Sequence, residues 1–193
     1  MKHQDNAHHV SELVALIKTL SYEKRLIKLV SGRQSDFYVD MKNTLLHPRG
    51  IWLVGQLILS RIKHQNEFGG AKIRGIGGLT MGADPISTSV SLLSQNLTYP
   101  LFAFYIRKEQ KGHGTAQWLE GMKNFKPGDK VVILEDVVTT GGSTMKSVTR
   151  ARMGGLDVCG IITVVDRQEG GAENITAQSI PFSSLVTREM IIS

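Results

Sequence analysis

Two adjacent carboxylates, Glu135 and Asp136, lie shortly before a segment rich in threonine, glycine and serine, Thr139–Thr144. Carboxylate oxygens accept hydrogen bonds from hydroxyl groups. The segment that follows supplies backbone N–H groups, side-chain hydroxyls and the positive end of an expected helix, a combination that binds phosphate. Hydroxyl acceptors beside a phosphate-binding segment indicate that the ligand is a sugar phosphate.

The flanking residues predict the elements that position this segment. The apolar run Val131–Leu134, preceded by Pro127-Gly128-Asp129, is typical of a strand buried on both faces. A helix is expected over Met145–Met153, where Gly154-Gly155 stops it. Buried parallel strands present their carboxyl ends to a ligand crevice, so the two acids are expected where this strand ends.

The common phosphate motifs do not fit this segment. It lacks the G-x-G-x-x-G fingerprint of dinucleotide-binding folds and the Gly-Lys-Ser/Thr ending of a Walker A loop. The order of four apolar residues, two acids, two apolar residues, Thr and a Gly/Ser/Thr-rich loop is similar to the signature of type I phosphoribosyltransferases. The alternative is an ordinary strand, turn and helix with two solvated acids.

Two other segments are candidates for binding anions. The glycine-rich segment Gly77–Gly82 is either a tight turn or a second cradle of backbone N–H groups that fits a diphosphate. The basic segment Arg107–His113 is either a solvated charged loop or a mobile lid that closes on phosphates. As a lid, it would use His113 to protonate a leaving diphosphate, while Lys111 and Arg107 neutralise its charge.

Arg167 follows another apolar run, Val158–Val165, and is flanked by Asp166 and Glu169. A guanidinium group forms bidentate pairs with carboxylates. The partner of Arg167 is therefore either the carboxylate of a ligand or a nearby acid of the same chain.

The remaining pattern predicts an α/β fold. A helix is expected over about residues 8–20. Leu26–Val30 and Phe37–Val39 are expected to form an antiparallel pair that covers the main sheet. A second helix opens at His47–Gly50. Strands alternating with helices then imply a mostly parallel sheet with helices on both faces, and the loops that hold the candidate residues converge on one crevice. The other expected elements are strands at Lys72–Gly77, Leu101–Ile106 and Phe182–Val186 and a helix over about residues 85–95.

Composition limits the class of protein. The 193 residues suffice for one domain with a sizeable core, and 41% of them are hydrophobic and 21% charged, as in ordinary globular proteins. No apolar run reaches the ~18 residues that span a membrane. A single cysteine, Cys159, cannot form an internal disulfide, which favours a reducing cytoplasm. The net charge of +6 favours anionic partners.

The chain closely resembles the orotate phosphoribosyltransferase family from Ser31–Tyr38 to Asp166–Glu169. Arg107–Gly114 resembles the mobile R-K-x-x-K-x-H-G loop of this family, and Asp166-Arg167-Gln168-Glu169 resembles its D-R-Q-E element. These two elements are more specific than the phosphoribosyl diphosphate signature, which many phosphoribosyltransferases share.

The resemblance implies a type I phosphoribosyltransferase fold, with a mostly parallel central sheet flanked by helices and a small N-terminal hood. Residues 1–193 would form one domain, with the hood at roughly 1–45 and the core at roughly 46–193. It also implies Mg²⁺-dependent transfer from 5-phosphoribosyl 1-diphosphate to orotate. The expected assembly is a homodimer in which the mobile loop reaches the neighbouring site, with no nucleic-acid or membrane partner.

The resemblance also assigns roles to residues. Lys111, His113 and Asp136 are the expected catalytic residues, and Thr139 and Arg167 are expected to contact orotate. No protein ligand to the metal is expected, because the substrate carries most of the magnesium coordination. The residues expected to bind phosphoribosyl diphosphate are Arg107, Lys108, Lys111, His113, Glu135, Asp136, Val137, Val138, Thr139, Thr140, Gly141, Gly142 and Ser143.

This chain departs from the family pattern at two positions. Val30 replaces a lysine that many members carry, and Met81 replaces a lysine found in one branch, so Lys28 or Lys42 could substitute in part. Two alternatives to orotate transfer are a purine phosphoribosyltransferase and a nucleic-acid-binding regulator on the same fold. The basic loop and Arg167 disfavour the first alternative, and the lack of a helix-turn-helix extension disfavours the second.

Overall fold

The computed structural model describes residues 3–28, 34–63, 68, 70, 72–109 and 118–193. In this part of the chain the main sheet has six strands, and no helix is long and apolar enough to cross a membrane. The spatial order of the strands is β5 (Leu119–Glu120), β4 (Phe102–Ile106), β3 (Gly75–Leu79), β6 (Lys130–Val138), β7 (Asp157–Asp166) and β8 (Phe182–Thr187).

The pairing of these strands confirms the mostly parallel sheet. Strands β4, β3, β6, β7 and β8 are parallel to their neighbours, and only the short edge strand β5 runs antiparallel, against β4. The chain moves outward in one direction from β3 to β4 and in the other direction from β6 through β7 to β8. The boundary between β3 and β6 is therefore the topological switch point of the sheet.

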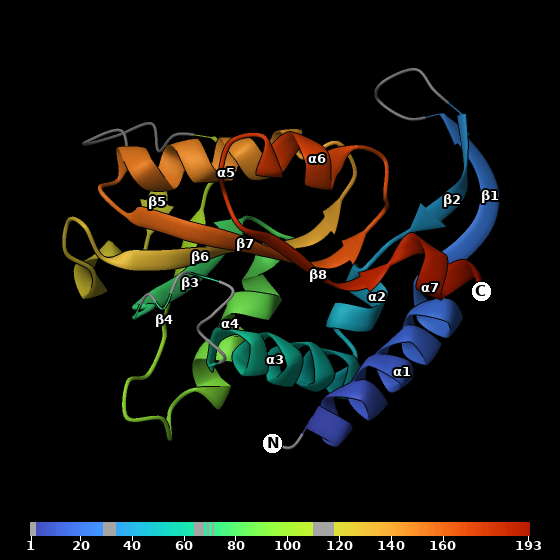
Figure 1. Ribbon diagram of the computed structural model, residues 1–193, viewed down its shortest axis with the longest axis horizontal. Helices are drawn as coiled ribbons and strands as arrows, with labels where there is room; N and C mark the ends of the chain where they lie inside the picture. The colour runs from blue at the N-terminus through green and yellow to red at the C-terminus, as the bar shows by residue number, and fades with distance from the viewer. Residues whose placement is uncertain (1–2, 29–33, 64–67, 69, 71, 110–117) are drawn as a thin grey trace.

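Helices cover both faces of the sheet (Figure 1). On one face lie α3 (Pro48–Lys63) and α4 (Ala83–Leu93), and α1 (His3–Leu20) packs on α3. On the other face lie α5 (Gly142–Met153) and α6 (Gly171–Thr176). The short 3-10 helix η2 (Met122–Asn124) follows β5.

Strand β6 is buried on both faces, as its apolar sequence predicted. Val132 and Leu134 belong to the core under α3 and α4, whereas Val131 and Ile133 belong to the core under α5. This division follows from the alternation of side chains along a strand. The same alternation directs the next residue, Glu135, toward α5.

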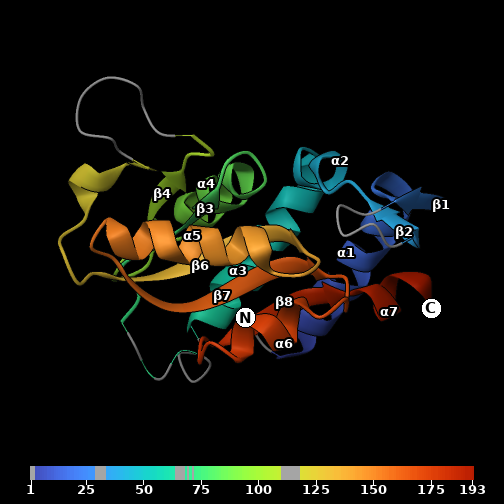
Figure 2. The ribbon, with the colours of Figure 1, turned by 90° about the horizontal axis from the view of Figure 1, so that it is seen from above.

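The N-terminal part forms a separate two-stranded antiparallel sheet, β1 (Tyr22–Lys28) and β2 (Gln34–Val39). The antiparallel pair was predicted, but β1 begins four residues before Leu26 and β2 begins three residues before Phe37. It lies beside β8 and the C-terminal helix α7 (Arg188–Ile192), at the end of the molecule opposite β4 (Figure 2). A single helical turn, α2 (Lys42–Leu45), joins this hood to α3.

Several predicted boundaries were wrong. Strand β6 does not end at the two acids but continues to Val138, because Val137 and Val138 pair with Val165 and Asp166 of β7. Helix α5 begins at Gly142, three residues before the predicted start. Helix α1 begins at His3, and β3 begins only at Gly75. The short elements α2, β5, α6 and α7 were not predicted.

Candidate active site

The two acids lie on β6 at the switch point of the sheet. The ladder between β3 and β6 ends at the Gly77–Ile133 pair, whereas β6 stays paired with β7 through Val138 and Asp166. Glu135 and Asp136 therefore occupy the stretch of β6 that no longer pairs with β3. Open α/β sheets bind ligands at this point, so the acids are placed where the sequence predicted, although inside the strand.

Glu135 is buried, with 6% of its surface exposed, and points to the first turns of α5. The hydroxyl group of Thr144, which is fully buried, donates a hydrogen bond of 2.9 Å to Oε2 of Glu135. Burial, and next the negative charge of Asp136, raise the pKa of Glu135 to about 8. At neutral pH this carboxyl group is mostly protonated in the ligand-free protein.

Asp136 is half-buried and faces the start of α4. A Cβ atom placed on Gly82 would lie 2.5 Å from its Oδ1, so only glycine fits there without displacing the carboxylate. Burial raises the pKa of Asp136, while the backbone N–H of Val137, which donates to Oδ1 at 3.0 Å, and the charge of Lys42 act in the opposite direction. The Gly77–Gly82 segment and the acids therefore meet, as predicted.

Lys42 is a charged residue near the site, and the sequence left its role open. Its Nζ lies 2.8 Å from Oδ1 of Asp40, and this pairing raises the pKa of Lys42. Its positive charge also favours the ionised form of Asp136. Lys42 thus supplies a cation close to Asp136, whereas Met81 lies in an exposed position and Val30 lies outside the described residues.

The turn between β6 and α5 leaves backbone groups accessible. Gly141 is the N-cap of α5, with a φ angle of 81°, and no side chain caps this helix. Gly142 and Ser143 are exposed, and the carbonyl of Thr140 accepts a hydrogen bond of 3.1 Å from Asn174. The free N–H groups of a helix start fit an anion. Thr144 was expected to join this cradle, but its hydroxyl group is turned inward to Glu135.

The basic segment is described only in part. Nε of Arg107 lies 2.6 Å from Oε1 of Glu120 on β5, and Arg150 of α5 donates hydrogen bonds to the carbonyls of Arg107 and Lys108. Lys108 is exposed. Lys111 and His113 lie outside the described residues.

Arg167 is 7% exposed and has partners within the chain. Its Nη2 lies 2.8 Å from Oε1 of Glu169 and donates a hydrogen bond of 2.9 Å to the carbonyl of Phe37 on β2. The sequence allowed either a ligand carboxylate or an acid of the same chain as the partner of Arg167, and in the structure the partner is the acid of the same chain, Glu169. These contacts tie the end of β7 to the hood. The sequence offered Asp166 and Glu169 as nearby acids without choosing between them, and it gave no signal for the carbonyl of Phe37.

Comparisons with known proteins agree with this geometry. The family model described as "Phosphoribosyl transferase domain" matches residues 59–180. The chain is 42% identical to the orotate phosphoribosyltransferase of Sorangium cellulosum over 182 residues, 93% of this chain and 91% of that protein. It is also 42% identical to that of Aquifex aeolicus, over 90% and 92% of the two chains.

The chain belongs to the orotate phosphoribosyltransferase family. A solved structure of the Mycobacterium tuberculosis orotate phosphoribosyltransferase, in complex with 5-phospho-alpha-D-ribosyl 1-diphosphate, is similar with a TM-score of 0.73 and 30% identity. That similarity covers 96% of this chain and 99% of the other. The type I phosphoribosyltransferase fold expected from the sequence is therefore confirmed.

Proposed function

We propose that this chain transfers the 5-phosphoribosyl group from 5-phosphoribosyl 1-diphosphate to orotate. The products are orotidine 5′-phosphate and diphosphate, a step of pyrimidine nucleotide synthesis. The observation that carries this proposal is the pair of acids at the switch point beside the uncapped start of α5, in a member of the orotate phosphoribosyltransferase family.

The two acids have different roles in this proposal. Asp136 is the catalytic acceptor, and its carboxylate accepts a ribose hydroxyl group and stabilises the positive charge that develops on the ribose ring. Glu135, with a pKa of about 8, binds its hydroxyl group as a mostly neutral carboxyl, which can both donate and accept. Thr144 holds the orientation of Glu135.

The segment after the acids binds the 5′-phosphate. Val137 and Val138 line the approach to this phosphate at the end of β6, and the backbone N–H groups of Thr139, Thr140, Gly141 and Gly142, together with the hydroxyl of Ser143, hold it at the start of α5. Arg107, Lys108, Lys111 and His113 neutralise the leaving diphosphate, with Lys111 and His113 acting as the loop closes.

Orotate is held by Thr139 and Arg167. Arg167 already shares its guanidinium group with Glu169 and the carbonyl of Phe37, so its charge is fixed in position between β7 and the hood. A fixed guanidinium is suited to the carboxylate of orotate, because little side-chain entropy is lost when that carboxylate binds.

Mg²⁺ fits the oxygen donors at this site. Among the described residues no group of three or more His, Cys, Asp or Glu side chains is arranged as a metal cage. Magnesium keeps several waters and is commonly held by substrate phosphates with few protein carboxylates, so most of its coordination would come from the diphosphate substrate. When bound, the ion neutralises negative charge on the diphosphate.

The deciding experiment follows the loss of orotate absorbance in the presence of phosphoribosyl diphosphate and magnesium. Turnover of orotate is expected, with loss of activity when EDTA removes the metal. Turnover of adenine or hypoxanthine but not of orotate would contradict the proposal and identify a purine enzyme. Absence of any turnover, together with salt-sensitive DNA binding, would identify a regulator.

We also propose that residues 1–193 act as one domain, with the hood at roughly 1–45 and the core at roughly 46–193, in a cytoplasmic homodimer that shares its basic loop between sites. Mixing Lys111→Ala with Asp136→Asn chains tests the sharing. If the loop serves the neighbouring site, half of the dimers carry one intact site and about one quarter of wild-type activity returns. No recovery, with mixed dimers present, would contradict loop sharing.

A further inference from the structure

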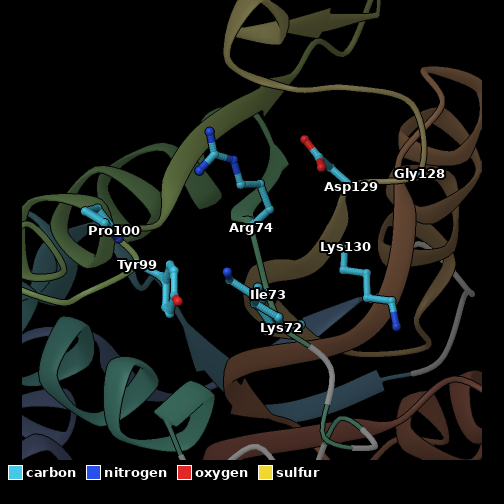
Figure 3. Close-up of a pocket in the computed structure, with 8 residues that line it drawn as sticks. All are labelled: Lys72, Ile73, Arg74, Tyr99, Pro100, Gly128, Asp129 and Lys130. Atoms are coloured by element: carbon cyan, nitrogen blue, oxygen red, sulfur yellow. The ribbon is translucent and has the colours of Figure 1, made fainter.

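The amino-terminal edge of the main sheet carries a hollow of about 320 Å³ that the proposed reaction does not use. It lies among the residues that lead into β3, β4 and β6 (Figure 3). Lys130 begins β6 and lies five residues before Glu135, which at ~3.3 Å per residue places the hollow about 16 Å from the acids.

The lining is cationic. Three cationic side chains, Lys72, Arg74 and Lys130, and one carboxylate, Asp129, leave a net charge of +2. Oδ2 of Asp129 accepts a hydrogen bond of 2.8 Å from the backbone N–H of Lys126, so part of this carboxylate serves the turn before β6. Within the described part of the chain, no ion pair within 4.0 Å involves any of the three cations.

Aromatic rings hold two of these cations in place. Nζ of Lys72 lies 3.4 Å from the ring centroid of Tyr99, and Cζ of Arg74 lies 4.1 Å from that of Phe102. A ring face attracts a cation without cancelling its charge. The two cations are thus positioned but remain able to neutralise an anion.

The backbone around the hollow is fixed by strand pairing. The N–H of Arg74 donates to the carbonyl of Lys130 at 2.7 Å, and the N–H of Phe102 donates to the carbonyl of Arg74 at 3.1 Å. Ile73 is buried beneath the hollow, at 7% exposure. Tyr99, at 60% exposure, and the exposed Pro100 add apolar surface at the rim. A preformed site with cations beside an exposed ring favours a ligand that has a phosphate and a flat base.

We propose that this hollow binds a nucleoside monophosphate, with its phosphate held by Lys72 and Arg74 and its base against Tyr99 and Pro100. The volume lies at the small end of the range for small-molecule sites, which fits a mononucleotide. Lys130 lines the opposite side of the hollow and points away from Lys72 and Arg74, so it adds positive charge around the site without contacting the phosphate (Figure 3). The site does not depend on the transferase activity.

Isothermal titration with AMP tests this site in the full-length chain. Two classes of AMP site are expected, one at the phosphate cradle before α5 and one at the hollow. The Lys72→Ala/Arg74→Ala double variant should weaken the second class at least about tenfold, because two charge-assisted contacts are lost. Lys126→Ala removes a cation from the turn before β6 that is outside the lining; it is the control and should retain both classes.

Orotate turnover separates this proposal from the transferase function, because the double variant should keep wild-type turnover. A single class of AMP site that the double variant retains would overturn the proposal. If the double variant unfolds more readily, Tyr99→Ala decides instead: it removes both the base contact and the ring that positions Lys72, so it should weaken binding of AMP more than binding of ribose 5-phosphate. Equal effects on both ligands, or no effect on either, would overturn the placement of the base.

Discussion

Replacing Glu135 by glutamine should change how the stability of the protein depends on pH. In the folded chain the pKa of Glu135 is about 8, against an ordinary value of 4.5, because burial and Asp136 disfavour its charge. Between these two values the folded state keeps a proton that the unfolded state has lost. Stability therefore falls as pH rises from about 4.5 to about 8, and the Glu135→Gln variant lacks this contribution.

The size of the effect follows from the shift of the pKa. The folded and unfolded pKa values of Glu135 differ by about 3.5. Because a pKa difference of one corresponds to 1.36 kcal/mol, the stability changes by about 5 kcal/mol between pH 4.5 and pH 8. Between pH 5.5 and 7.5 the wild type should lose about 3 kcal/mol relative to Glu135→Gln. This is a large part of the 5–15 kcal/mol that stabilises a typical domain.

Urea unfolding of both proteins at pH 5.5, 6.5, 7.5 and 8.5 measures this difference directly. Glu173→Gln, which removes an exposed carboxyl group on α6, controls for the loss of one acid and should follow the wild type. If the free energies of unfolding of the wild type and Glu135→Gln change in parallel across this range, Glu135 ionises as an ordinary carboxyl and the proposed division of roles between the acids is wrong.

Three further substitutions test the geometry of the site. Thr144→Val leaves Oε2 of Glu135 without its hydrogen-bond donor, and it should cost about 1–3 kcal/mol of stability and shift the pH profile of kcat. Thr144→Ser keeps the hydroxyl group and should restore both the stability and the profile. Equal pH profiles in the two variants would contradict the positioning role of Thr144. Gly82→Ala pushes a methyl group against the carboxylate of Asp136, so it should lower kcat/KM at least about tenfold with little change in Tm. An unchanged kcat/KM would show that the Asp136 side chain can move freely. Arg167→Ala should lower stability by about 3 kcal/mol, because it leaves the largely covered carboxylate of Glu169 without its cation, and it should raise the KM for orotate. A loss of stability with unchanged KM would restrict Arg167 to a structural role.

The sequence predicted the centre of the molecule better than its connections. The apolar run before Glu135 predicted both the strand and the end at which the acids lie, because a strand buried on both faces is typical of the interior of a parallel sheet. The extension of β6 through Val138 depends on pairing with β7, and no local signal reports that pairing. Strand β5, with two residues, is too short to show a period.

Side-chain partners were the least predictable part of the site. Arg167 had two possible partners in sequence terms, and its burial between β7 and the hood explains why the internal acid is present. The bond between Thr144 and Glu135 joins a helix to a strand, and in the sequence Thr144 is indistinguishable from the hydroxyls of the phosphate cradle. The proximity of Lys42 to Asp136 likewise depends on how the hood docks.

The contacts of the hood also constrain the order of events during synthesis. Phe37 receives its hydrogen bond from Arg167, which is 130 residues away, and Asp36 pairs with Arg188, which is 152 residues away. Because a chain emerges from the ribosome N-terminus first, the β1–β2 hairpin is made early but has to wait for nearly the whole chain before these partners exist. Closing such long loops is slow. The hairpin is therefore expected to dock last, and a chain that stalls before Arg167 would leave it undocked.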